Sequence, residues 1–110
     1  MPRKLLTDFE LMVLLAILRV GDEAYGVPIA REIEQTAGRP VLLGAVYAAL
    51  DRLGIMGLVS SSIGDPTPER GGRAKKYFRI TRHGLRAVQD TQRALIALWT
   101  DVPVLAGRRS

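Results

Sequence analysis

The first hydrophobic stretch of the chain predicts a helix that is apolar on nearly every side. Thr7 and Glu10 have the spacing of a capping box, in which a threonine hydroxyl and a glutamate carboxylate satisfy free amides at a helix start. The run from Phe9 to Leu18 then has almost no polar position, so a helix from about Asp8 to Val20 should be buried all round. In a chain this small, such burial suggests help from a partner subunit.

Two further helices follow. Pro28 is tolerated in the first turn of a helix from Gly26 to Ala37, where a missing amide hydrogen does no harm, and Gly38 ends that helix. Beyond the Arg39-Pro40 break, apolar residues recur at steps of three and four, which predicts a third helix over residues 43–56. Its apolar stripe consists of Leu43, Val46, Tyr47, Leu50 and Leu53.

The opposite face of this third helix is unusually smooth. It has three small side chains and one arginine: Gly44, Ala45, Ala48 and Arg52. A smooth face allows a helix to approach another surface closely. Packing of the small residues against a neighbouring helix explains the pattern almost equally well.

The next segment predicts a β-hairpin. Two strands are expected over residues 58–63 and 74–80, and the glycines and prolines between them exclude regular structure in the connection. Alternate side chains of a strand lie on opposite faces, so Phe78 and Ile80 share a face with Lys76. The other face is then basic and has Lys75, Tyr77 and Arg79.

A last helix is expected over about residues 82–100, with Thr81 as its cap. Heptad spacing predicts a helix–helix seam, made of Leu85, Val88, Gln92, Leu95 and Trp99. The seam could pack on the first helix of the same subunit or across a dimer axis, and the excess apolar surface of the first helix favours the dimer. A frayed tail is expected over residues 103–110.

Charge changes the picture of an ordinary small domain. The net charge is +5, and seven basic residues with no acidic neighbour lie between positions 70 and 86. They are Arg70, Arg73, Lys75, Lys76, Arg79, Arg82 and Arg86. A polyanionic partner is implied, although a solvated face that keeps the protein soluble explains an average basic stretch about as well.

Composition excludes several other classes of function. There is no cysteine, so disulfides, zinc knuckles and thiol catalysis are ruled out, and a reducing cytoplasm suits the chain. The longest apolar run, Leu11 to Leu18, is far below the roughly 20 residues that cross a bilayer, so no membrane contact is expected. No phosphate loop, metal-spaced histidine cluster or nucleophile with a partner base is present, which predicts a non-enzyme without metal or cofactor.

The order of the elements predicts both fold and function. The chain reads as one domain, mainly α with a small β-hairpin (α+β), and three helices, a basic hairpin and a further helix form a winged helix-turn-helix with a C-terminal dimerisation helix. In that fold the third helix enters the major groove of double-stranded DNA, and the wing, residues 58–80, lies along the backbone. The alternatives are a winged-helix module that binds a protein without reading DNA, and RNA binding.

Three segments also resemble the PadR family of bacterial transcriptional regulators. Tyr25–Ile29 resembles the family's tyrosine-glycine start of helix two, and Leu43–Leu53 with Gly57-Leu58-Val59 resembles its recognition helix. Gly72–Gly84 resembles its basic wing strand and the Thr-x-x-Gly start of its last helix. The resemblance implies a homodimeric regulator of the short subfamily, commonly a repressor, on an inverted-repeat operator. Two departures are Ala45, where the family usually has threonine, and Gly54, where it has an acidic residue.

The candidate site residues fall on the third helix, the wing and the last helix. The expected DNA contacts are Gly44, Ala45, Tyr47, Ala48, Arg52, Arg73, Lys75 and Lys76. For Tyr47, contact with the backbone and packing in the core are about equally supported, and Asp51 is a potential surface partner of Arg52. For Trp99, packing is favoured over a pocket; the resemblance permits a small aromatic effector there, because members of the short subfamily can respond to such compounds.

Overall fold

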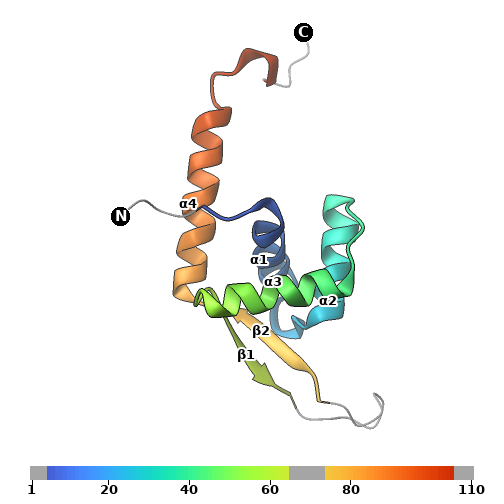
Figure 1. The fold of residues 1–110 in the computed structure, drawn as a ribbon. Coiled ribbons are helices and arrows are strands. Elements are labelled where there is room, and N and C mark those ends of the chain that lie inside the picture. Colours follow the sequence, from blue (N-terminus) through green and yellow to red (C-terminus); the bar gives the residue numbers. More distant parts are fainter. Residues whose placement is uncertain (1–4, 65–73, 106–110) are drawn as a thin grey trace.

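The structure is a computed structural model that describes residues 5–64 and 74–105 of the 110-residue chain. Three helices pack together, a hairpin lies beside them, and a long last helix extends away (Figure 1). The helices are α1 (Asp8–Val20), α2 (Gly26–Glu32), α3 (Leu43–Ile55) and α4 (Arg82–Trp99), and the strands are β1 (Val59–Ile63) and β2 (Lys76–Ile80). Short helical turns are η1 (Gly21–Glu23), η2 (Ile33–Ala37) and η4 (Pro103–Leu105).

The start of α1 confirms the predicted capping box. The Thr7 hydroxyl accepts a hydrogen bond from the Glu10 amide at 3.2 Å, and the Glu10 carboxylate accepts one from the Thr7 amide at 2.9 Å. Burial of α1 is less complete than expected within one chain, because Leu15 and Leu18 stay 41% and 44% exposed. The domain itself therefore does not cover this side of α1.

The second helix differs from the sequence prediction in its last turn. The expected α-helix to Ala37 is wrong there, since α2 ends at Glu32 and continues as the π-helical turn η2. The Glu32 carboxylate accepts a hydrogen bond from the Thr36 hydroxyl at 2.6 Å inside this turn. Gly38 ends the segment with φ 69° and ψ 22°, a left-handed conformation that glycine adopts without strain.

The core lies where α1, α2 and α3 meet the hairpin. Its fully buried large side chains are Val13, Leu14, Ile29, Val46, Leu50 and Leu53, and the hairpin adds Val59 and Phe78. Three of the five stripe residues predicted for α3 are therefore core residues. Leu43 and Tyr47 are the exceptions, at 41% and 39% exposure, because they lie at the edge of the stripe.

The hairpin is anchored along both edges of β2. On one edge β2 pairs antiparallel with β1, in a register that sets Val59 opposite Ile80 and Ser61 opposite Phe78. On the other edge the Phe78 amide donates a hydrogen bond to the Ala24 carbonyl at 2.8 Å, which ties the wing to the segment just before α2. The position of the wing relative to the helices is thereby fixed.

The start of α4 depends on close packing at Gly84. The Thr81 hydroxyl accepts a hydrogen bond from the Gly84 amide at 3.0 Å, which confirms Thr81 as the helix cap. A β-carbon at position 84 would overlap with the Leu58 carbonyl oxygen, so only glycine fits there. The Leu6 amide donates a hydrogen bond to the hydroxyl of Thr91, in the middle of α4, at 3.2 Å. Beyond Thr91, α4 projects away from the other helices (Figure 1).

The chain after α4 forms a short turn. Where the sequence predicts fraying from residue 103, Pro103–Leu105 are the 3-10 turn η4, and residues 106–110 lie outside the described residues.

Candidate nucleic-acid interface

The smooth face of α3 is open to solvent. Gly44, Ala45 and Ala48 are all exposed, and a β-carbon at Gly44 would have no neighbour within 4 Å. Packing of these residues against another helix, the alternative that the sequence left open, does not occur within the described chain. A surface that can approach a partner closely is therefore available along α3.

Tyr47 lies at one edge of this face and is held by α2. A β-carbon at Gly26, the first residue of α2, would overlap with the ring and hydroxyl of Tyr47. The tyrosine-glycine pair of the family resemblance thus has a physical reason, since Gly26 leaves the space that the Tyr47 ring occupies. The hydroxyl is consequently near the amino end of α2, where the helix dipole favours negative charge.

Lys75 extends this group of residues toward the wing. Its ammonium nitrogen is 4.2 Å from the centre of the Tyr25 ring, a cation–π contact. The Tyr25 ring meets that of Tyr77 edge to face, with centroids 5.5 Å apart. Lys75 and Tyr47 therefore flank the Tyr25-Gly26 pair from the wing and from α3, which brings two of the predicted DNA-binding residues to the start of α2.

Lys76 lies on the side of the hairpin that faces α3. It is exposed and, with Asp51, Ile55 and Ser61 among others, lines a shallow pocket of about 280 Å³ between α3 and the hairpin. The structure thus joins Lys76 to the exposed surface of α3. Arg73, the remaining wing residue predicted to touch DNA, lies outside the described residues.

Arg52 is on the opposite flank of α3 and pairs with α1. Its Nε is 3.8 Å from Glu10 Oε2, and the Glu10 side chain is only 9% exposed. The surface pair with Asp51 that the sequence suggested is therefore wrong, because successive residues of a helix point in different directions. Arg52 remains half exposed but lies away from the wing.

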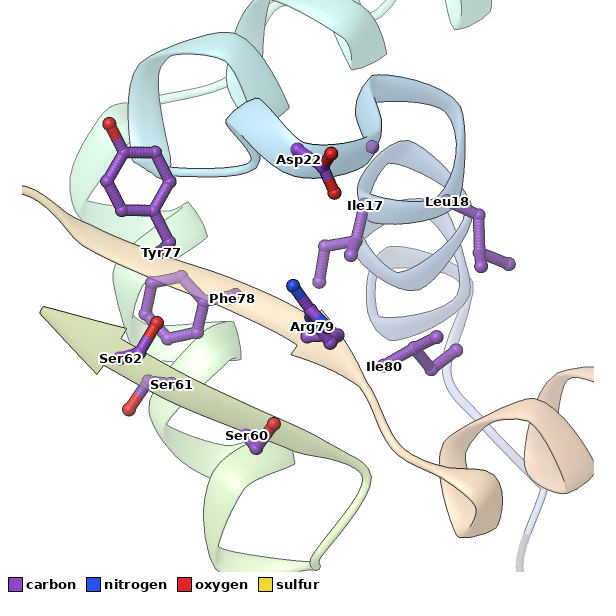
Figure 2. Close-up of a pocket in the computed structure, with 11 residues that line it drawn as sticks. Ile17, Leu18, Asp22, Ser60, Ser61, Ser62, Tyr77, Phe78, Arg79 and Ile80 are labelled. Atoms are coloured by element: carbon purple, nitrogen blue, oxygen red, sulfur yellow. The ribbon is translucent and has the colours of Figure 1, made fainter. Parts of the chain in front are cut away.

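Lys75 and Arg79 lie on the same face of β2 as Tyr77, as strand alternation predicts, although their surroundings differ. An open cleft of about 540 Å³ lies between α1, η1 and the hairpin. Arg79 of β2 lies across this cleft from Asp22 of η1 (Figure 2). Its walls include Ile17 and Leu18 of α1 together with hairpin residues. Arg79 thus lies beside α1, whereas Lys76 lines the α3 side and Lys75 lies on Tyr25. The wing therefore presents Lys75 and Arg79 on one face and Lys76 on the other.

Two residues of the α3 surface were not among the predicted site residues. Asp51 and Ile55 are exposed, and Ile55 reaches 87%. Both follow Gly44 and Ala48 at helical spacing, so extending the same helical wheel by one turn would have found them. The outer face of α3 accordingly has a carboxylate and a large apolar side chain besides its small residues.

The predicted seam on α4 is mostly uncovered in one chain. Leu85, Leu95 and Trp99 are 40%, 43% and 62% exposed, and Gln92 is exposed as well. Val88 is different, because it is buried in the core of its own domain. Two neighbouring residues that the heptad pattern did not include, Ile96 and Leu98, are 55% and 75% exposed.

Two other kinds of site are absent from residues 5–64 and 74–105. In that part of the chain no helix has the length and apolar character to span a membrane. The same residues contain no group of three or more histidine or acidic side chains placed to hold a metal ion.

Three packed helices, an exposed third helix and a hairpin wing tied to the second helix define a winged helix-turn-helix protein that binds DNA. A family model described as the transcriptional regulator PadR-like family matches residues 14–90. The chain therefore belongs to the PadR-like family of transcriptional regulators, as the three sequence segments indicated. No curated protein sequence matches it.

Solved structures share this fold. The hsRosR-S4 complex is 29% identical, with a TM-score of 0.65 over 87% of this chain and 76% of that chain. A PadR family regulator from Eggerthella lenta DSM 2243 is 24% identical, with a TM-score of 0.69 over 89% and 83% of the two chains. A PadR-like regulator from Bacillus cereus strain ATCC 14579 is 22% identical, with a TM-score of 0.70 over 92% and 93%. The predicted fold, helical with one antiparallel hairpin and a C-terminal helix, is confirmed.

Proposed function

We propose that this protein is a homodimeric repressor that binds an inverted-repeat operator, with α3 in the major groove and the wing along the backbone. The observation that carries the proposal is the open smooth face of α3 beside wing lysines. A helix of this length spans roughly 20 Å, and the major groove of B-DNA, about 12 Å wide, admits a helix whose outer side chains are small. Gly44, Ala45 and Ala48 meet that requirement.

Backbone contacts would come from the residues around the start of α2. The Lys75 ammonium group and the Tyr47 hydroxyl flank that helix end, so a phosphate placed there would meet a cation, a hydroxyl and the positive end of a helix dipole. Lys76, exposed on the α3 side of the hairpin, and Arg73 would hold neighbouring phosphates. Contacts of this kind fix the position of α3 on the duplex without selecting a sequence.

A second copy of the chain would supply the other half-site. The far half of α4 exposes Leu95, Ile96, Leu98 and Trp99, and α1 exposes Leu15 and Leu18. Contact across a two-fold axis would remove these apolar side chains from water. A two-fold dimer presents two copies of α3 in opposite orientations, which is the arrangement that an inverted repeat requires.

The end of α4 would also hold a flat aromatic effector. The Trp99 side chain is 62% exposed in the single chain, so the two indoles of a dimer are available for stacking with a planar ligand. Titration of a chemically varied set of aromatic compounds against indole fluorescence tests this proposal. If no compound in the set changes the emission, Trp99 is a packing residue only.

The experiment that tests the main function is a gel shift with the DNA upstream of the protein's own gene, in excess competitor DNA. Ala48→Glu places a bulky anion in the middle of the α3 face and should abolish the shift. Ala97→Glu is the matched control, since Ala97 is exposed on α4 and lies on the side of that helix opposite the predicted seam. If the wild-type protein binds DNA only weakly and without sequence preference, a winged-helix module that binds a protein is favoured instead.

A further inference from the structure

The centre of the α3 outer face has an unusual chemistry for a DNA-reading helix. The residues that point away from the buried stripe are Gly44, Ala48, Asp51 and Ile55, at steps of four, three and four residues. All four are exposed. The only polar side chain among them is the Asp51 carboxylate, which accepts hydrogen bonds and, when ionised, donates none.

The hydrogen-bond donors of α3 lie on its flanks and are held there. Tyr47 packs on Gly26 at the edge nearest the wing. Arg52 is directed toward the buried Glu10 at the opposite edge. The part of α3 that would lie deepest in a groove is therefore left with one acceptor and apolar groups.

Asp51 has no ion pair in the described part of the chain. It lines the same shallow pocket as Lys76, yet no side-chain nitrogen and carboxylate oxygen of these two residues come within 4.0 Å. Next to Asp51 on the helix surface, Gly54 leaves open space, since a β-carbon there would have no neighbour within 4 Å. The carboxylate is consequently free to meet a base edge.

The major groove offers a carboxylate few favourable partners. Guanine presents the acceptors N7 and O6, and thymine presents the acceptor O4, so both repel it. Adenine combines a donor amino group with the acceptor N7. Cytosine presents its N4 amino group and is the base that an aspartate selects best.

We propose that Asp51 is a specificity-determining residue whose carboxylate accepts a hydrogen bond from the N4 amino group of a cytosine in each operator half-site. Ile55, one turn further along α3, then contacts the methyl group of a neighbouring thymine. This inference rests on the proposed entry of α3 into the major groove. Asp51 would act mainly by weakening binding to wrong sites. At such a site the carboxylate meets phosphates or base acceptors instead of an amino group, and it is repelled.

Selection of binding sites from a randomised DNA library tests the assignment. Wild type should enrich an inverted repeat with a cytosine at one fixed position of each half-site. Asp51→Asn should change the preference at that position toward adenine, which an asparagine recognises through N6 and N7. Asp51→Ala should lose the preference at that position alone and bind unselected DNA more tightly. Asp22→Asn, which changes the net charge equally on the far side of the wing, should leave the selected sequence unchanged.

A second measurement identifies the atom that is read. Replacing that cytosine by a pyrimidinone base that lacks the amino group should weaken wild type roughly 5- to 100-fold, the range of one good base contact, and should leave Asp51→Ala unaffected. If wild type enriches no sequence at all, the proposed function fails. If it enriches a sequence that Asp51→Asn and Asp51→Ala also enrich unchanged, the operator reading stands and the role of Asp51 is overturned.

Discussion

The ring of Tyr47 lies so close to Gly26 that a β-carbon at position 26 would overlap with it. This contact joins the middle of α3 to the first turn of α2 and sets the position of one helix on the other. Gly26 is therefore needed for its lack of a side chain, and Tyr47, still 39% exposed, combines a packing role with a surface position. Packing and surface exposure therefore occur together in Tyr47, and its contact with the DNA backbone stays a prediction.

Gly26→Ala is expected to destabilise the fold by about 1–3 kcal/mol, the usual range for an overpacked site, and to weaken DNA binding because Tyr47 is displaced. Urea unfolding and a gel shift measure the two effects. Tyr47→Ala in the same chain makes room for the new methyl group, so the double variant should lose less stability than the two single changes added together. Simple additivity would mean that the close contact does not limit the site.

Gly84→Ala should destabilise the protein more than Gly54→Ala, although both change a glycine within a helix. At position 84 the new β-carbon meets the Leu58 carbonyl, a backbone atom that cannot rotate away. At position 54 it meets open space, and replacing a helical glycine by alanine there should stabilise by roughly 0.5–1 kcal/mol. Thermal unfolding of the two variants beside wild type shows the difference, and similar shifts for both would contradict the packing at Gly84.

Much of this fold could be predicted from the sequence because its signals are local. The Thr7 capping box, the glycine stop at Gly38 and the Thr81 cap each depend on residues a few positions apart. They predict where α1 begins, where η2 ends and where α4 begins. The π-helical turn η2 could not be predicted, since no simple residue pattern specifies a widened turn.

The candidate site was harder to predict than the fold, because its geometry depends on contacts between distant segments. Strand alternation correctly placed Lys75 and Arg79 on one face, but it could not show that Lys75 lies on the Tyr25 ring and that Arg79 lies in a cleft beside α1. Arg52 pairs with Glu10, which is remote in the sequence but adjacent where α1 crosses α3. Such partners follow from tertiary packing alone.

The pH dependence of stability should include a contribution from Glu32. Hydrogen bonds from the Thr36 hydroxyl and from Arg19 lower the pKa of this carboxyl below its usual 4.5, and partial burial opposes them only weakly. The folded chain therefore binds this proton less readily than the unfolded chain. The stabilisation is complete above about pH 4.5 and is lost as the pH falls through the lowered pKa.

Glu32→Gln should flatten the acid limb of a plot of urea midpoint against pH, because its side chain has no proton to gain. Glu23→Gln removes an exposed carboxyl of η1 and is the control. An acid limb equally steep in Glu32→Gln and in wild type would show that the contacts from Thr36 and Arg19 do not contribute.

The dimer proposal predicts that Leu95→Glu converts the protein to a monomer, because it places a charge in an apolar seam. Sedimentation measures the molecular mass. Operator affinity should fall as well, because a monomer contacts only one half-site. Ala97→Glu adds the same charge to an exposed position of α4, on the side opposite the predicted seam, and should remain dimeric. If Leu95→Glu remains a dimer, the two subunits meet through another surface.

Lys75 is expected to contribute affinity without specificity. Lys75→Ala should weaken binding to operator and to unrelated DNA by similar factors, and it should reduce the slope of log Kd against log salt by about 0.9, the value for one released phosphate contact. Arg93→Ala removes an equal charge from α4, where Arg93 pairs with Asp90 at 3.2 Å, and should leave the slope unchanged. Because Lys75 also rests on the Tyr25 ring, Lys75→Met keeps an aliphatic chain there and separates the lost charge from the lost packing. An unaltered slope in both Lys75 variants would remove this residue from the backbone contacts and leave the wing with Lys76 and Arg73.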